Sequence, residues 1–271
     1  IALKIINMNF TNKVIWITGA SSGIGKALAI QLSKLGAKQI LSARNEEKLN
    51  DVKHVCKNPE FIKVLPLDLE DYSSFEGKVT EAINWSGRID IIVNNGGISQ
   101  RSLASETLIE VDKRIMDVNY LGTIALTKAI LPHFIENKIG QFVVTTSIVG
   151  KIGTPLRSSY AASKHALHGF FDSLRAENHK NNISVTLICP GFVNTNVSIN
   201  ALIGDGSAQN KMDVATQNGI DVNRFAKLMA KAIYAKKEEV YIAGVKEKLG
   251  VYIKRFFPKL LSIMIRKLSV T

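Results

Sequence analysis

The stretch Val14-Ile-Trp-Ile-Thr-Gly-Ala-Ser-Ser-Gly-Ile-Gly25 decides the fold class of this chain. Its first five residues are almost all β-branched or aromatic, which is typical of a strand buried on both faces. Gly19, Gly23 and Gly25 then allow a tight turn and a close approach to a ligand. The apolar residues that follow recur at helical spacing: Ile24, Leu28, Leu32 and Leu35. A strand, a glycine turn and an amphipathic helix in this order predict a helix N-terminus that holds a pyrophosphate.

The alternation of short β-rich runs and longer helical patterns continues almost to the end of the chain. We predict further strands at Gln39–Ala43, Phe61–Pro66, Ile89–Val93, Gln141–Thr146, Ile183–Ile188 and Val240–Ile242. Helices are expected at Glu46–Cys56 and around residues 72–86, 106–136, 158–179 and 222–236. This rhythm predicts a single-domain, doubly wound α/β fold of the Rossmann type, with a mostly parallel seven-stranded sheet and helices on both faces. We place this domain at residues 8–245, with a polar loop at 195–220 and a basic tail at 246–271.

Composition excludes several classes of protein. The chain has 271 residues, of which 46% are hydrophobic, so it is neither disordered nor of low complexity. Cys56 and Cys189 lie far apart without zinc-ligand spacing, which favours a reducing compartment and a cytoplasmic location. No uncharged apolar run reaches the roughly 20 residues needed to span a bilayer. We take Met8 as the natural start, preceded by an added or misassigned segment of seven residues.

Further motifs occur downstream in a fixed order: Asn94-Asn-Gly-Gly97 after the fourth strand, then Ser147, then Tyr160-Ala-Ala-Ser-Lys164. With the glycine turn they resemble the short-chain dehydrogenase/reductase family, and the resemblance runs from about Asn12 to Ala243. Within the family, three segments resemble the dehydrogenase/reductase member 7B-like branch: Val111–Tyr120, Ser159–His165 and Ser198–Ser207. One departure is Gly96, where the family usually has Ala. It removes only a methyl group, and we expect no damage to the site.

Tyr160 and Lys164 lie four residues apart, so a helix places both on one face. A free phenol has a pKa near 10, and a nearby ammonium lowers that pKa toward neutral pH, where Tyr160 can move a proton. The resemblance implies that Ser147 holds the reacting oxygen and that Asn119 keeps a water in a relay to Lys164. It also implies a hydrogen bond from Lys164 to the nicotinamide ribose. The predicted catalytic group is therefore Asn119, Ser147, Tyr160 and Lys164.

The end of the second predicted strand indicates the cofactor. An NAD site would place an acidic residue here, but Ala43 stands in that position and Arg44 follows. A guanidinium can form two hydrogen bonds to a 2′-phosphate, so NADP(H) is preferred over NAD(H). The alternative is an ordinary solvated arginine, and Ser22 stands where some NADP-type relatives carry a second basic residue.

The resemblance implies the remaining cofactor contacts. Asp68 would contact the adenine, although helix capping is an alternative for an Asp at this place. Asn94 and Gly96 would line the adenosine side, and Thr195 would bind the nicotinamide carboxamide. The full predicted set is Gly19, Ser21, Ser22, Gly23, Ile24, Gly25, Arg44, Asp68, Leu69, Asn95, Gly96, Gly97, Tyr160, Lys164, Pro190, Gly191, Val193 and Thr195.

The polar stretch 195–220 matches the family's mobile substrate loop, and a plain surface insertion is the alternative. Residues expected to border the pocket carry no charge: Ile98, Ser99, Gly153, Leu156 and Phe192. We therefore expect an NADP(H)-dependent oxidoreductase that interconverts a carbonyl and a secondary alcohol on a small hydrophobic substrate. The alternative function is a non-catalytic NADP(H)-binding regulatory or scaffold protein.

Neither a metal nor nucleic acid is expected as a partner. His165 and His168 share a helix, but no further ligand stands at suitable sequence spacing, and the chemistry needs no metal. The net charge of +12 comes without a basic aromatic platform for nucleic acid. The resemblance implies a homodimer or homotetramer built through the helices at 106–136 and 158–179, with Phe170 and Phe171 as candidate contacts.

The tail at 246–271 holds seven basic residues against Glu247 alone, half of the net charge of the chain. Its apolar residues recur at steps of three and four around Pro258: Leu249, Ile253, Phe256, Phe257, Leu260, Leu261, Met264 and Leu268. Such a segment suits peripheral contact with an anionic membrane. The alternative, which we favour slightly, is that this face packs on the domain, caps the substrate pocket or meets a partner subunit.

Overall fold

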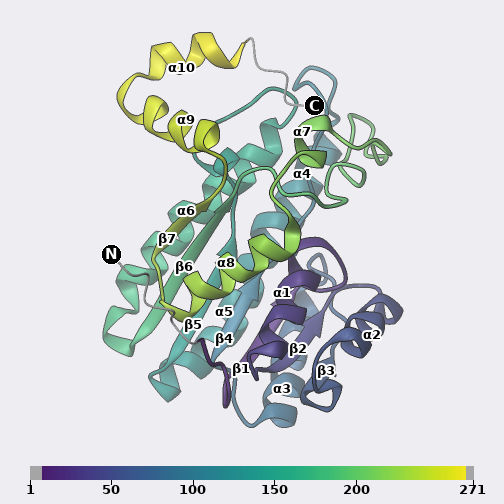
Figure 1. The fold of residues 1–271 in the computed structure, drawn as a ribbon, viewed down its shortest axis with the longest axis vertical. Helices are drawn as coiled ribbons and strands as arrows, with labels where there is room; N and C mark the ends of the chain where they lie inside the picture. Colours follow the sequence, from purple (N-terminus) through teal and green to yellow (C-terminus); the bar gives the residue numbers. More distant parts are fainter. Residues whose placement is uncertain (1–7, 267–271) are drawn as a thin grey trace.

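Strand β1 (Val14–Thr18) pairs with β2 (Lys38–Ser42) on one side and with β4 (Ile91–Asn94) on the other. The strand order is β3-β2-β1-β4-β5-β6-β7, and every pair is parallel. The remaining strands are β3 (Ile62–Val64), β5 (Gly140–Thr145), β6 (Ile183–Pro190) and β7 (Glu239–Ile242). The computed structural model describes residues 8–266, and in it the predicted seven-stranded doubly wound sheet is confirmed (Figure 1).

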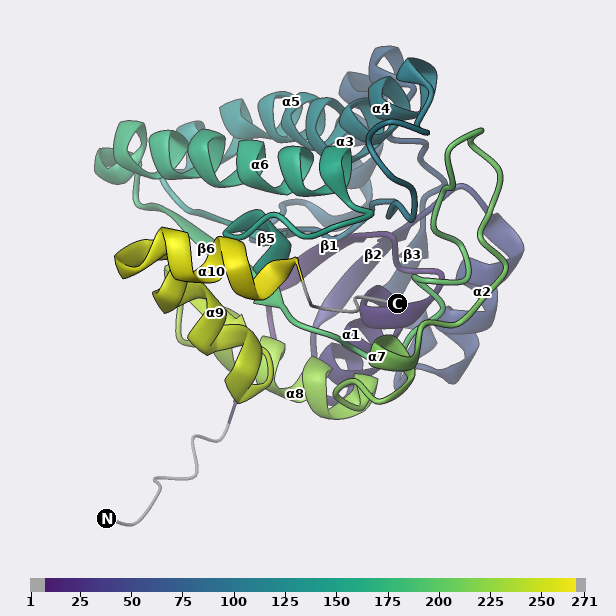
Figure 2. The ribbon, with the colours of Figure 1, turned by 90° about the horizontal axis from the view of Figure 1, so that it is seen from above.

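Helices cover both faces of the sheet (Figure 2). One face carries α1 (Gly23–Lys34), α2 (Glu46–Val55) and α8 (Val222–Tyr234). The other carries α3 (Phe75–Ser86), α5 (Gly122–Asn137) and α6 (Ser158–Glu177). The shorter helices are α4 (Ile109–Met116), α7 (Val214–Gln217), α9 (Val245–Phe256) and α10 (Pro258–Ile265). From β1 the chain adds strands toward one edge of the sheet, and from β4 it adds strands toward the other edge. A crevice therefore opens between β1 and β4 at their carboxyl ends.

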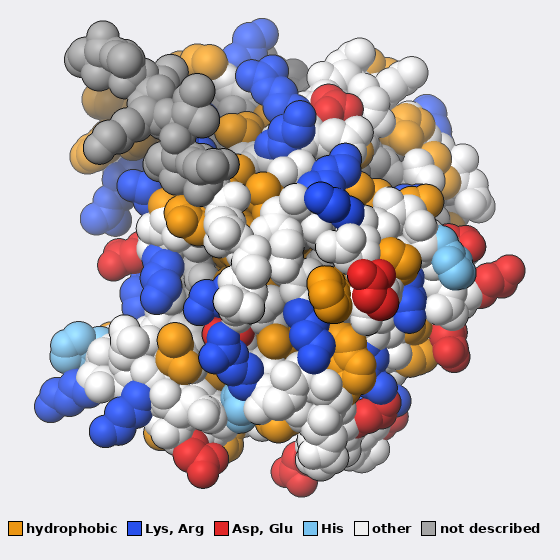
Figure 3. Space-filling view, turned by 60° about the horizontal axis from the view of Figure 1, so that its bottom comes forward, with side chains coloured by type: hydrophobic (Ala, Val, Ile, Leu, Met, Phe, Trp, Pro, Cys, Tyr) orange, Lys and Arg blue, Asp and Glu red, His pale blue; other side chains and the backbone are white. Residues whose placement is uncertain are grey.

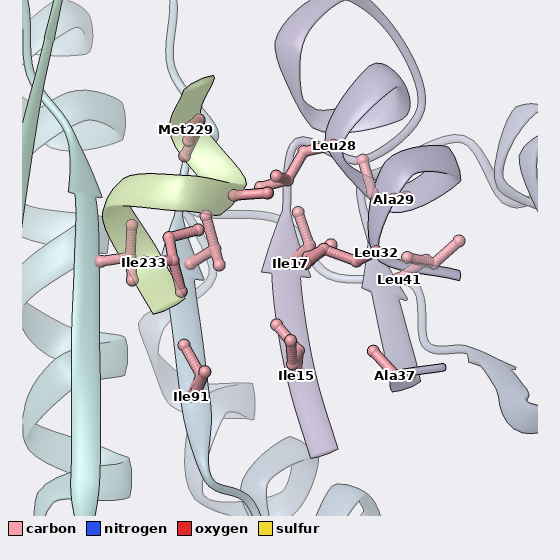
Figure 4. Packing of buried hydrophobic residues seen from close by; sticks show 14 of the residues in the cluster. Ile15, Ile17, Leu28, Ala29, Leu32, Ala37, Leu41, Ile91, Met229 and Ile233 are labelled. Atoms are coloured by element: carbon pink, nitrogen blue, oxygen red, sulfur yellow. The ribbon is translucent and has the colours of Figure 1, made fainter. Parts of the chain in front are cut away.

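The core forms because alternate residues of each strand point to opposite faces. Ile15 and Ile17 face α1 and α8, whereas Trp16 lies among residues of the opposite face. Figure 4 shows the first of these layers, in which Ile15 and Ile17 pack with Leu28, Leu32, Met229 and Ile233. Trp16 is fully buried, and its indole N–H donates to Ser42 Oγ at 2.8 Å. Both faces of the sheet are therefore covered by packed apolar side chains, as the unbroken apolar run of β1 predicts.

The long helix expected at 106–136 is not uniform. It begins as α4, passes through a π-helical turn at Asp117–Leu121 and continues as α5. Four short 3₁₀ turns also interrupt the predicted pattern, at Pro59–Phe61, Tyr72–Ser74, Ile148–Gly150 and His179–Asn181. The predicted strand ends shift by one or two residues. The π-helical turn contains Asn119, one of the predicted site residues, so the irregularity lies at the site.

One predicted oligomer contact is wrong. Phe171 is fully buried and packs in the core against Phe142 and Phe170. Phe170 is half-buried and meets Tyr120 edge-on. The sequence shows two adjacent phenylalanines on a helix, but neighbouring positions on a helix point about 100° apart. Phe171 points into the domain and cannot meet another subunit.

The tail forms two helices, α9 and α10, which lie against the β6–β7 side of the molecule in both Figure 1 and Figure 2. Leu261 is buried there with Ile148, Ile152 and Cys189. One face of the tail therefore packs on the domain, as we favoured. Lys267 and Leu268 of the predicted tail, and the segment before Met8, lie outside the described residues. No helix between residues 8 and 266 is long and apolar enough to cross a membrane.

Candidate active site

A cleft of about 620 Å³ runs along the carboxyl ends of the strands, from the end of β2 to the loop after β6. Among the predicted cofactor residues, only Gly25 does not line this cleft. Residues far apart in sequence thus meet in one place: the glycine turn, Arg44, Asp68, residues 95–97, Tyr160, Lys164 and residues 190–195. The cleft lies where the strand order reverses, which is the position that open α/β sheets use for ligands.

The glycine turn packs too tightly for side chains. A Cβ on Gly19, whose φ is +64°, would lie 2.8 Å from Gly96 Cα. A Cβ on Gly25 would lie 2.2 Å from the Gly19 carbonyl oxygen. Gly25 therefore packs directly against the backbone of the turn, and no side chain fits between them. Gly23 also has a positive φ, of +52°, and a Cβ there would make only ordinary van der Waals contact with Thr195, at 3.5 Å. The first turn of α1 therefore presents bare backbone to the cleft, which fits a pyrophosphate group.

Two threonines that the sequence analysis missed hold this turn in place. Thr18 Oγ1 accepts hydrogen bonds from the backbone N–H groups of Asn95 and Gly96, both at 3.0 Å. The Asn95 side chain donates to the Thr18 carbonyl at 3.2 Å and accepts from Thr145 Oγ1 at 3.2 Å. Asn94 behaves differently from our expectation: it is buried and donates to Thr127 Oγ1, away from the cleft. Its position at the buried end of β4 decides this, because consecutive strand residues point in opposite directions.

Two cations lie at the end of β2, where Ala43 replaces the acidic residue of an NAD site. Arg44 is exposed and lines the cleft, as does Lys48 in the first turn of α2. Asn45 caps this helix by accepting from the Lys48 N–H at 2.8 Å. Lys48 was missed because it belongs to the next helix. Arg44 lies before the Asn45 cap and outside this helix, so helical periodicity gives no signal for the pair.

Ser147, Tyr160 and Lys164 all line the cleft. Ser147 follows β5 by two residues, and its Oγ accepts from the Val149 N–H at 3.1 Å, which fixes the hydroxyl at the start of a 3₁₀ turn. Burial raises the pKa of Tyr160, while its hydrogen bond with Ser147 and the nearby charges of Arg157 and Arg101 lower it; the net direction is upward. The phenol therefore keeps its proton through neutral pH.

Lys164 differs from our expectation. Its Nζ donates to the Thr145 carbonyl at 2.9 Å and lies 5.8 Å from the centre of the Tyr160 ring. Burial lowers the pKa of Lys164 to about 8. The positive charges that lower the pKa of Tyr160 are those of Arg157 and Arg101. The i, i+4 spacing predicts a shared helix face correctly but does not fix the direction of the ammonium.

Asn119 lies behind the cleft rather than in its wall. Its amide forms a closed pair with the backbone of Ile98, accepting from the N–H at 2.8 Å and donating to the carbonyl at 2.9 Å. The same amide donates to Ser163 Oγ at 3.1 Å. Asn119 therefore connects the π-helical turn, the loop after β4 and helix α6, and it lies on the far side of Gly97 from the cleft.

A buried ion cluster that no motif predicted lies beside the catalytic group. Arg101 donates through Nε to Asp213 at 2.8 Å, and its Nη2 lies 2.7 Å from the same carboxylate oxygen. Arg157 Nη2 lies 3.6 Å from that oxygen, and its guanidinium stacks 5.5 Å from the Phe192 ring. All three charged side chains are at most 4% exposed. Asp213 belongs to the predicted substrate loop, so the cluster fixes this loop to α6 just ahead of Tyr160.

The residues that line the substrate end of the cleft differ in part from those expected. Ile98 and Ser99 line it, but Gly153, Leu156 and Phe192 do not. Residues of the substrate loop take their place: Asn196, Val197, Asn200, Leu202 and Ala208. The loop is fixed here by a bridge between Gln100 and Leu202. Among the described residues around this end, the lining ones are apolar or uncharged, and the charges of the ion cluster lie behind them.

His168, Cys189 and Glu239 come together within 4.8 Å, although no ligand spacing in the sequence indicates it. The carboxylate of Glu239 already pairs with Lys151 at 2.8 Å and accepts from Tyr241. Burial raises the pKa of Cys189 to about 12, so its thiol is protonated in the metal-free protein. We assign no ion to this cluster. His168 has the packing role that we expected, and His165 is exposed.

The fold and the cleft define a nicotinamide-dependent oxidoreductase of the Rossmann type. The chain belongs to the short-chain dehydrogenase family, whose model matches residues 13–203. It is 44% identical over 267 residues to "Dehydrogenase/reductase SDR family protein 7-like" of Anopheles gambiae, covering 96% of this chain and 84% of that protein. It is 43% identical over 254 residues to "Dehydrogenase/reductase SDR family member 7" of Homo sapiens, covering 92% and 75%.

Among solved structures, levodione reductase superposes with a TM-score of 0.78 and 28% identity, covering 89% of this chain and 99% of that chain. The resemblance deduced from the motifs is thereby confirmed. The chain is an oxidoreductase that acts on CH–OH groups with NAD(P)(H). These matches favour an enzyme over the non-catalytic alternative.

Proposed function

We propose that this protein uses NADPH in preference to NADH and reduces the carbonyl group of a small hydrophobic substrate, or runs the reverse oxidation. The observation that carries the cofactor preference is the pair of cations, Arg44 and Lys48, beside Ala43 at the end of β2. Charge-assisted contacts from both would hold a 2′-phosphate, and no carboxylate follows β2 directly to oppose it.

The residues that would hold the cofactor fit its parts. The bare backbone of Gly19, Ser22 and Gly23 would take the pyrophosphate, and Asp68 would lie toward the adenine. Asp68 Oδ1 already accepts from the Glu70 N–H at 3.1 Å, which orients the carboxylate. When bound, the reduced cofactor supplies the hydride.

The protein supplies the proton. Tyr160 keeps its phenolic proton at neutral pH because burial raises its pKa, and a donor beside the carbonyl oxygen must be protonated. Ser147, held by the Val149 N–H, would hold the same oxygen. Lys164, with a pKa of about 8, would bind the nicotinamide ribose beside Tyr160, and Asn119, which donates to Ser163 Oγ, would position α6.

The cofactor proposal is tested by the Arg44→Ala and Lys48→Ala variants. Each lost contact should cost about 1.5–3 kcal/mol with NADPH, about tenfold or more in affinity, and little with NADH. Lys53→Ala, at a half-buried position on the same helix that does not line the cleft, is the matched control. Equal losses for both cofactors would overturn the preference.

The substrate class is tested with a graded series of ketones assayed by NADPH absorbance. The uncharged lining at Ile98, Val197 and Leu202 supports turnover that improves with apolar surface. Equal activity on hydrophilic and carboxylated ketones of the same size would contradict the assignment.

We also propose a homodimer or homotetramer formed through α4, α5 and α6. Leu121 and Ile135 of this helical layer are each 38% exposed and replace Phe171 as candidate contacts. Light scattering gives the molar mass of the unmodified chain and of the Leu121→Asp variant, and we expect an oligomer that the substitution weakens. A monomer in both cases would exclude this interface. A cytoplasmic location stays a prediction; both cysteines are free and buried, which fits it.

A further inference from the structure

Large apolar side chains are exposed most densely on α9 and α10. Eight of the 21 exposed large apolar residues between positions 8 and 266 lie in this hairpin: Val245, Leu249, Tyr252, Phe256, Phe257, Leu260, Ile263 and Met264. On α9 they follow steps of four, three and four residues, which form one stripe along the helix. Phe256 and Phe257, at the turn of the hairpin, are 68% and 63% exposed. The inner face of the hairpin buries Leu261 on the domain, so this stripe is a second, outer apolar face.

The exposed charged residues of the hairpin are all basic. Five basic residues are exposed: Lys246, Lys254, Arg255, Lys259 and Arg266. In residues 8–266 none of them has a carboxylate within 4.0 Å. The single acidic residue, Glu247, points inward and accepts from the Phe192 N–H at 3.0 Å. The exposed surface of the hairpin therefore carries apolar and cationic side chains and no carboxylate. On the face shown in Figure 3, by contrast, basic, acidic and apolar side chains are interspersed.

We propose that the outer face of the α9–α10 hairpin binds the surface of an anionic lipid bilayer. Aromatic and aliphatic side chains flanked by lysine and arginine suit the boundary between headgroups and acyl chains, where apolar stems are buried and charges meet lipid phosphates. A protein interface is a poorer fit, since its core is depleted in lysine and this stripe has cations along its whole length. The proposal does not depend on the cofactor or on the substrate.

The inner face of the hairpin lies beside the cleft. Helix α9 packs on the 3₁₀ turn after Ser147, and Glu247 contacts the backbone at Gly191 and Phe192. A bilayer bound to the outer face would therefore be separated from one wall of the active site by the hairpin itself.

Vesicle flotation of the full chain tests the proposal. We expect binding to vesicles of phosphatidylserine and phosphatidylcholine, with about tenfold or more loss for Lys254→Glu/Arg255→Glu, and a fall with rising salt. Phe256→Ser/Phe257→Ser should lose binding to a similar degree. The matched controls are Lys227→Glu/Lys231→Glu on α8 and Val55→Ser/Phe61→Ser, all exposed positions elsewhere, which should float like the unmodified chain.

Three outcomes would overturn the proposal. The unmodified chain could remain in the soluble fraction at low salt, or the control pairs could lose binding as much as the hairpin pairs. Alternatively, Phe256→Ser/Phe257→Ser could abolish self-association without affecting flotation, which would identify the face as an interface between copies. Thermal unfolding of each variant shows whether the variant is folded, because substitutions at these exposed positions should leave the midpoint nearly unchanged.

Discussion

Arg101 and Asp213 form a buried ion pair across 112 residues of sequence, with Nη2 2.7 Å from the carboxylate. Arg157 reaches the same carboxylate, so two guanidinium groups share one negative charge. Removing that charge takes the shared carboxylate away from two buried guanidinium groups that still repel each other, which costs more than the loss of the contacts alone.

Asp213→Asn should therefore reduce the free energy of unfolding by about 3 kcal/mol or more, measured by urea denaturation. The substrate loop should also loosen and raise KM, because Asp213 is its attachment to α6. Asp205→Asn, an exposed position in the same loop, should change stability by less than about 0.5 kcal/mol. A cost at Asp213 as small as at Asp205 would show that the ion cluster does not hold the loop.

Tyr160→Phe should lower kcat by about 10²-fold or more, because the ring stays in place while the proton donor is lost. Cofactor affinity should stay near that of the unmodified enzyme, since the phenol oxygen is one contact among many in the cleft. Single-turnover kinetics with fluorescence titration of NADPH separate the two effects. Substantial turnover by the variant would remove Tyr160 from the reaction.

Burial lowers the pKa of Lys164 to about 8, from 10.5 in the unfolded chain. The charged amine therefore destabilises the folded state by about 3 kcal/mol below pH 8, and this cost disappears as the pH rises toward 10. Lys164→Met should accordingly be more stable than the unmodified chain at pH 7, with a difference that shrinks between pH 8 and 10. Urea unfolding across this range checks the sign. A difference that is independent of pH would show that the amine is well solvated.

Two neighbouring glycines should respond differently to alanine. A Cβ at Gly96 would meet Leu69 Cδ1 at 2.8 Å, the end of a flexible side chain, so Gly96→Ala should keep most of the activity. A Cβ at Gly97 would meet Asn119 Oδ1 at 2.8 Å, and this amide is fixed by three hydrogen bonds. Gly97→Ala should therefore lower kcat/KM by about tenfold or more, because the Asn119 amide must leave the Ile98 backbone. Similar activities for the two variants would contradict this assignment of Asn119.

The sequence predicted what depends on short-range pattern. The run at Val14–Thr18, the glycine turn and the Tyr160–Lys164 spacing are local, and each fixes a piece of backbone whose place in a parallel sheet is then determined. This is enough to assemble the cofactor side of the cleft, from Gly19 to Thr195.

Contacts between distant segments could not be read in this way. Arg101 and Asp213 are both ordinary charged residues until the loop folds back, and Lys48 joins Arg44 only because α2 begins with a tight turn. Phe171 was misplaced because the sequence does not say which side of α6 faces the sheet. The tail was predicted with a single apolar face, whereas α9 and α10 have an inner one and an outer one.

The substrate loop is attached to the domain at several points, among them Leu202 to Gln100, Gly204 to Leu108, Asp213 to Arg101, and Ile220 to Val193. Between Gly204 and Asp213 lies a segment of the loop, residues 205–212, whose ends are fixed by the rest of the domain. Such a segment can be exchanged as a cassette, because its replacement leaves the register of the sheet and the catalytic helix untouched. Libraries that vary this interval while retaining Gly204 and Asp213 would therefore alter the cleft wall at Ala208 and leave Asn196, Val197 and Asn200 in place.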